Sequence, residues 1–143
     1  MTRIIDALSA LRPGSAFTMV PGDFATLVWQ DPNRGPPTLE EVLAKRAELE
    51  AQARIDAVKA EARRRILARF PEWHQANMTA RGVELLNIRV AVGSWTAPQA
   101  QEAAALGVAW DWIKAVRAAS DTIEALAPIP ADFASDTRWP ESG

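Results

Sequence analysis

A run of basic residues between positions 54 and 69 is the strongest local charge signal in this chain. Six basic and two acidic side chains give this run a local charge of +4. Such a stripe can follow a phosphate backbone. No aromatic residue interleaves with the run, and acidic stretches elsewhere offer ion-pair partners. A solvated or salt-bridged face is therefore favoured over nucleic-acid binding. The residues of this basic stripe are Arg63, Arg64, Arg65 and Arg69.

Tryptophan is the second chemical signal, because the chain has six Trp and no Tyr. An indole ring offers a large apolar surface with one N–H donor, and Trp is enriched in binding hot spots. Trp110 and Trp112 are two positions apart, so a helix points them to different faces. This spacing predicts one ring in a core and the other at an edge or interface. The candidate partner-binding residues are Trp73, Trp110, Trp112 and Trp139.

The sequence offers few residues that could support catalysis or bind a metal. His74 is the only histidine and the chain has no cysteine, which excludes multi-histidine metal sites, thiolate sites and a cysteine nucleophile. Carboxylates such as Asp111 and Glu124 have no spacing that would place two of them in one apolar pocket. Nucleotide-binding and hydrolase fingerprints are missing from the sequence. We therefore expect no catalytic residue, no metal and no cofactor, and we expect His74 on a helix surface.

Composition places the chain among ordinary globular proteins. It has 143 residues, 48% of them hydrophobic and 24% charged, which is enough for one domain or two small ones. A net charge of −2 gives no general attraction to nucleic acid or to an anionic membrane. No apolar run approaches the ~20 residues that a membrane span needs, and the N-terminus lacks the apolar core of a signal peptide. We expect synthesis in the cytoplasm.

One long helix is predicted over residues 39–70, which contain no Gly or Pro. Thr38 and Glu41 form a capping box at its start, and Pro71 ends it. At 1.5 Å per residue this helix would span roughly 48 Å, whereas a compact chain of this length is roughly 37 Å across. The sequence therefore predicts an elongated spacer or assembly element. Its middle is poor in large apolar residues, which fits a solvated stalk or a weak coiled coil.

A small α/β head is predicted over residues 1–37. Helical spacing at the start ends at Pro13-Gly14, and a Pro-Gly-Asp turn separates two β-like runs, Ala16–Val20 and Ala25–Gln30. Such a head is too small to be stable unless it docks on a helix or a partner.

The helical region is predicted over residues 38–143, with shorter helices after the long one. Helices are expected over 73–89 and 97–127, the second with a Thr96–Gln99 capping box, and a β-rich stretch over Arg89–Ser94. A proline-bearing tail follows. The expected fold is mainly α with a small N-terminal α/β head, elongated, with a long helix followed by a helical hairpin.

Several segments resemble small tail proteins of tailed bacteriophages and prophages, namely tail fibre assembly proteins and XkdW-type tail proteins. A strand ending in Trp29 precedes a helix capped by Pro37-Thr38, as in the heads of such proteins. The segment from Pro71 to Met78 resembles a Pro-x-Trp-Lys-Gln-x-Asn segment, with His74 where Lys is common. The terminal helix, with Trp112 where Tyr is more usual, is followed by a Trp-Pro pair. The resembling segments are residues 4–14, 26–29, 37–42, 71–78, 110–117 and 138–140.

This resemblance implies a role in building or decorating a phage tail, with no catalytic residues to carry over. The first hypothesis is a non-enzymatic tail fibre assembly factor or chaperone-like adaptor that binds a fibre or tail subunit in the host cytoplasm. The alternative is a structural virion component of the tail or fibre attachment site, oligomeric through the long helix. A nucleic-acid binder acting through the basic stripe is the third hypothesis. A homo-oligomer is left open, and no membrane partner is expected.

Overall fold

The computed structural model describes residues 2–141. It is 65% helical, with four α-helices and one two-stranded antiparallel sheet near the N-terminus, which confirms the mainly α fold with a small α/β head. The chain forms two compact units, Met1–Asp56 and Ala57–Gly143. The boundary between these two units lies inside the long helix, whereas the composition of the sequence changes after residue 37. Each unit is described below by itself.

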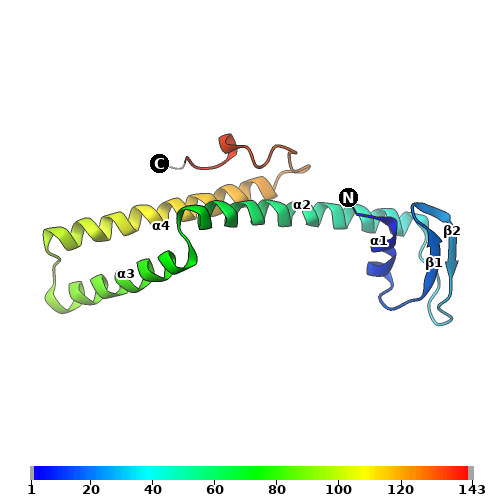
Figure 1. The fold of residues 1–143 in the computed structure, drawn as a ribbon, viewed down its shortest axis with the longest axis horizontal. Helices are drawn as coiled ribbons and strands as arrows, with labels where there is room; N and C mark the ends of the chain where they lie inside the picture. Colours follow the sequence, from blue (N-terminus) through cyan, green and yellow to red (C-terminus); the bar gives the residue numbers. More distant parts are fainter. Residues whose placement is uncertain (1, 142–143) are drawn as a thin grey trace. The chain divides into compact units, whose positions relative to one another are not determined.

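The first unit holds α1 (Ile4–Leu11), β1 (Phe17–Val20), β2 (Asp23–Trp29) and the beginning of α2 (Leu39–Arg69) (Figure 1). Its core is small, with three buried residues surrounded by partly buried apolar side chains from the helix, the hairpin and α2. The buried residues are Ala7, Leu8 and Val42. The head thus takes part of its core from the long helix, as expected for a hairpin that could not be stable alone.

The hairpin has the predicted turn. Gly22 adopts a φ of +87° between the strands, a conformation that residues with a Cβ rarely take. Phe17 pairs with Trp29 across the strands, and their rings stack with centroids 5.8 Å apart. The indole N–H of Trp29 donates to the backbone oxygen of Arg34. This contact ties the breaker-rich loop before α2 to the end of β2.

The long helix α2 is one uninterrupted element of 31 residues, as predicted to within one residue. Its capping box is formed: the backbone N–H of Thr38 donates to Glu41 Oε2 at 2.7 Å, and the Glu41 N–H donates to Thr38 Oγ1 at 3.2 Å. These two bonds satisfy donors that the first helical turn leaves free. Pro71 follows the helix and starts the next one.

The second unit holds the end of α2, then α3 (Glu72–Val92), α4 (Ala97–Glu124) and a tail with a 3₁₀ turn at Asp136–Arg138. Helices α3 and α4 form an antiparallel hairpin, as predicted, and the last turns of α2 run beside the second half of α4 (Figure 1). Inside the hairpin Leu85 is 1% exposed and Ile113 is fully buried. Arg81 of α3 donates to both carboxylate oxygens of Glu102 on α4, at 2.7 and 2.8 Å.

The predicted β-rich stretch over Arg89–Ser94 is wrong. Helix α3 continues through Val90 to Val92, and Gly93 closes it with a φ of +83° and an N–H that donates to the Arg89 oxygen at 2.8 Å. A chain already in a helix gains one hydrogen bond for each residue added, which outweighs the weak β preference of valine. Helix α4 has the predicted capping box and ends at Glu124 instead of residue 127. Within residues 2–141, no helix has the length and apolar character that crossing a bilayer requires.

Candidate functional site

A row of aromatic rings marks the point in the second unit where α2 passes into α3. Trp73 stacks on His74 with centroids 5.3 Å apart, and His74 meets Phe70 edge-on at 5.6 Å. Phe70 in turn meets Trp112 of α4 edge-on at 5.8 Å. Phe70 is buried, while Trp73 is 67% exposed. The row therefore runs from the core between α2 and α4 out to the surface of α3.

Two arginines of the basic stripe lie over aromatic rings. The guanidinium carbon of Arg69 is 4.7 Å from the centroid of Trp112 and 5.4 Å from that of Phe70, and that of Arg65 is 5.1 Å from Trp139. A cation is attracted to the face of an indole ring at such distances. No aromatic residue interleaves with the stripe along the sequence, but in the structure α4 and the tail place rings against it.

The C-terminal tail is held against these residues. Trp139 is 5% exposed, and its indole N–H donates to the Phe133 oxygen at 2.8 Å. Arg65 donates to the backbone oxygen of Ala134 and to Asp136, both at 2.8 Å. The indole N–H of Trp112 donates to the Glu141 oxygen at 2.9 Å. Two of the four candidate tryptophans thus have both ring and N–H engaged within the chain.

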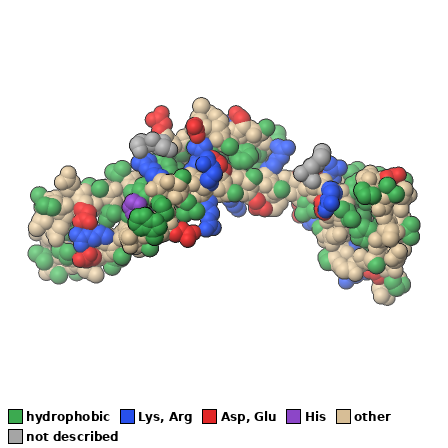
Figure 2. Space-filling view, in the orientation of Figure 1, with side chains coloured by type: hydrophobic (Ala, Val, Ile, Leu, Met, Phe, Trp, Pro, Cys, Tyr) green, Lys and Arg blue, Asp and Glu red, His purple; other side chains and the backbone are tan. Residues whose placement is uncertain are grey.

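The remaining arginines of the basic stripe are in ion pairs. Glu61 accepts from Arg64 at 2.6 Å and from Arg65 at 2.8 Å, and Arg63 pairs with Glu72 at 2.9 Å. Hydrogen bonds from Arg64, and then from Arg65, lower the pKa of Glu61 below its usual value. On the face shown in Figure 2, basic side chains lie next to acidic ones and form no continuous basic band. Each arginine of the stripe therefore has an acidic or aromatic partner in its own chain.

The other two candidate tryptophans differ in position. Trp73 is the exposed one, on the first turn of α3. Trp110 is half-buried on α4, and so is Trp112, so the prediction that one of this pair lies in a core is wrong. The buried ring is Trp139 instead. Contacts of Trp139 with Arg65 of α2 and with Phe133 of the tail accompany this burial, and helical spacing within α4 gives no information about them.

Several residues at the site were missed from the sequence. His74 is half-buried between two rings, whereas a plain surface position was expected. Glu61 lies three and four positions before its two arginines, the spacing of neighbours on a helix surface, so this pairing could have been found. The Phe70–His74 contact crosses Pro71, where helical spacing gives no guide.

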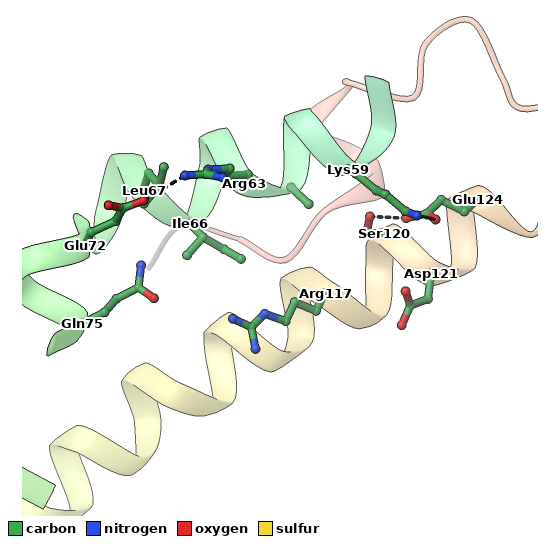
Figure 3. Close-up of a pocket in the computed structure, with 11 residues that line it drawn as sticks. Lys59, Arg63, Ile66, Leu67, Glu72, Gln75, Arg117, Ser120, Asp121 and Glu124 are labelled. Carbon is green, nitrogen blue, oxygen red and sulfur yellow. Dashed lines mark hydrogen bonds and ion pairs between the residues drawn. The ribbon is translucent and has the colours of Figure 1, made fainter. Parts of the chain in front are cut away.

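A groove of about 580 Å³ lies beside this cluster, between the end of α2, the start of α3 and the second half of α4 (Figure 3). Ala62, Ile66 and Leu67 give it an apolar floor. Lys59 pairs with Glu124 across it at 3.6 Å, and the Ser120 hydroxyl donates to Glu124 at 2.7 Å. The charged and polar residues around the floor are Lys59, Arg63, Glu72, Gln75, Arg117, Ser120, Asp121 and Glu124.

The charges around the groove balance, with three basic and three acidic side chains. An apolar floor with rims of both signs suits a polypeptide segment that buries an apolar side chain and pairs its flanking charges. A polyanion would meet three carboxylates there. No group of three metal-ligating side chains that could hold an ion occurs among residues 2–141. The groove thus combines an apolar floor with a rim of balanced charge.

Comparisons of the chain with protein-family models, with curated proteins and with solved structures find no match.

Proposed function

We propose that this chain is a non-enzymatic phage tail protein, an assembly factor or chaperone-like adaptor that binds a fibre or tail subunit. The resemblance of its short segments to tail fibre assembly proteins and XkdW-type tail proteins supports the biological setting. The groove of the second unit supports the mode of action. Its apolar floor and charge-balanced rims are the observation that carries the proposal, because they fit a segment of another protein.

Arg117 and Asp121 are the rim residues best suited to a partner. Both line the groove on α4, one turn apart, and both are exposed (Figure 3). Lys59, Arg63, Glu72 and Glu124 are already in ion pairs within the chain. A charged partner side chain would therefore meet Arg117 or Asp121 before it had to displace an existing pair. The partner segment is expected to carry an apolar residue flanked by an acidic residue for Arg117 and a basic residue for Asp121.

Co-expression with a phage tail fibre subunit tests the proposal. The wild-type chain should capture that subunit and raise its soluble yield, and Arg117→Glu should weaken capture because it reverses a charge on the groove rim. Lys114→Glu is the matched control, since Lys114 lies on the same helix, is 71% exposed and does not line the groove. Absence of a complex, or equal loss with both variants, would count against the groove.

The alternative, a virion component that oligomerises through the long helix, is favoured by one feature of α2. Leu39 and Leu43 lie one turn apart at its start and are 46% and 47% exposed. Exposed leucines at this spacing are typical of a helix surface that packs against another protein segment. Mass spectrometry of purified particles separates the two roles, because an assembly factor should be missing from finished virions and a tail component should be present.

A further inference from the structure

The outer face of α3 carries a short heptad pattern. Positions 76, 79, 83, 86 and 90 follow one another at spacings of three and four residues, which places them on one stripe of the helix. Valine occupies the a positions 83 and 90, and leucine occupies the d position 86. Valine at a with leucine at d favours parallel two-stranded coiled coils. The five residues of this seam are Ala76, Thr79, Val83, Leu86 and Val90.

The seam is exposed along its whole length. Val83 is 54% exposed, Leu86 is 57% exposed and Val90 is 78% exposed. The opposite side of α3 is already used, because Met78 and Leu85 are buried toward α4. Hydrophobic side chains also lie at the surface of the hairpin in Figure 2. The hairpin therefore leaves three large apolar side chains, Val83, Leu86 and Val90, exposed to water at heptad spacing.

Gly82 lies beside the seam in the middle of α3. Glycine weakens a helix interior relative to alanine. A Cβ built at Gly82 would meet nothing within 4 Å, so packing inside this chain does not require glycine there. A missing side chain at the edge of a helix seam lets another backbone approach closely. Gly82 therefore leaves open space beside the seam.

Charge also permits two copies to meet. The seam itself is uncharged, and its flanking positions 80 and 87 are Ala and Asn. Arg89 is the one charged flank, and its guanidinium is drawn back over the Trp95 ring, 4.6 Å from the centroid. Two copies aligned in parallel bring valine to valine and leucine to leucine without opposing like charges. A basic or acidic partner helix would find no complement on this stripe.

We propose that the α3 seam docks a second copy of this chain, with the two α3 helices parallel and in register. The seam covers about 21 Å of helix. A seam of this length is too short to bury the area of about 800 Å² per partner that a standard interface has. The dimer is therefore weak and forms only as the protein concentration rises. This self-association is separate from the groove and does not depend on the proposed tail function.

Sedimentation of the full chain over a wide range of concentration tests the dimer. The wild-type chain should pass from monomer to dimer, and Leu86→Glu should abolish the dimer while helix content stays unchanged. Val108→Glu is the matched control, because Val108 is a 68% exposed valine on α4 outside the seam. Gly82→Ala should raise the melting temperature of the monomer yet weaken the dimer. A wild-type chain that stays monomeric throughout, or a dimer that Leu86→Glu leaves intact, would overturn the proposal.

Cysteine cross-linking tests the alignment without relying on a charged substitution. The chain has no cysteine, so a single introduced thiol reports on one position. Val90→Cys should form a disulfide-linked dimer under mild oxidation, since parallel in-register helices place the two copies of position 90 together. Val108→Cys should not form one above the background of random collision. Equal cross-linking at the two positions, or none at position 90, would refute the parallel seam.

Discussion

Replacing Trp139 by alanine should release the C-terminal tail from the second unit. This ring is 5% exposed, lies under the Arg65 guanidinium and donates its N–H to the Phe133 oxygen. A Trp side chain buries about 150–250 Å², which corresponds to roughly 4–6 kcal/mol at ~25 cal/mol per Å². Because the unfolded chain already buries part of this surface, a loss of about 3–5 kcal/mol is expected.

Trp73→Ala is the matched control, because the same residue type is removed at a ring that is 67% exposed. About a third of the ring surface is buried there, so the loss should be about a third as large, ~1–2 kcal/mol. Urea unfolding followed by circular dichroism measures both variants, and limited proteolysis shows whether the tail has become accessible. If Trp139→Ala leaves the tail resistant, or costs no more than Trp73→Ala, the account of the tail contacts is wrong.

Two further predictions concern local contacts. Arg64 and Arg65 hold the pKa of Glu61 below its usual value, so the ionised carboxylate stabilises the fold fully above the unfolded pKa of about 4.3, and this stabilisation is lost as pH falls through the lowered pKa. In urea titrations at acid pH, Glu61→Gln should flatten the decline of the free energy of unfolding with falling pH. An unchanged decline would rule out this carboxylate as its source. Thr96→Ala removes the side-chain acceptor that caps α4 and should lower the free energy of unfolding by about 1 kcal/mol in thermal unfolding. Thr122→Ala removes an exposed hydroxyl that donates to the Ala118 oxygen within α4, and it should cost less. Equal losses would contradict the capping role.

The helices could be predicted because their ends are determined locally. Pro71 separates α2 from α3, and the two capping boxes at Thr38 and Thr96 mark helix starts through contacts three residues apart. The same local reasoning failed at Val90 and Val92. Their β preference is weaker than the gain from extending a helix whose inner face is already packed on α4.

The candidate site was only partly predictable. Arg65, Arg69, Trp112 and Trp139 were each singled out by residue type, and the structure pairs Arg65 with Trp139 and Arg69 with Trp112. Their mutual contacts join α2, α4 and the tail, and no spacing rule links residues so far apart in the chain. The groove was missed for the same reason, since Arg117 on α4 had no visible connection to the α2 residues that form the floor.

Lysine footprinting of the complex with the fibre subunit tests the central claim of partner binding most directly. The chain has three lysines, of which Lys59 lines the groove, Lys114 lies on α4 outside it and Lys45 belongs to the first unit. Binding in the groove should protect Lys59 from acetylation and leave the other two unchanged. Full reactivity of Lys59 in a complex that has demonstrably formed would contradict the account.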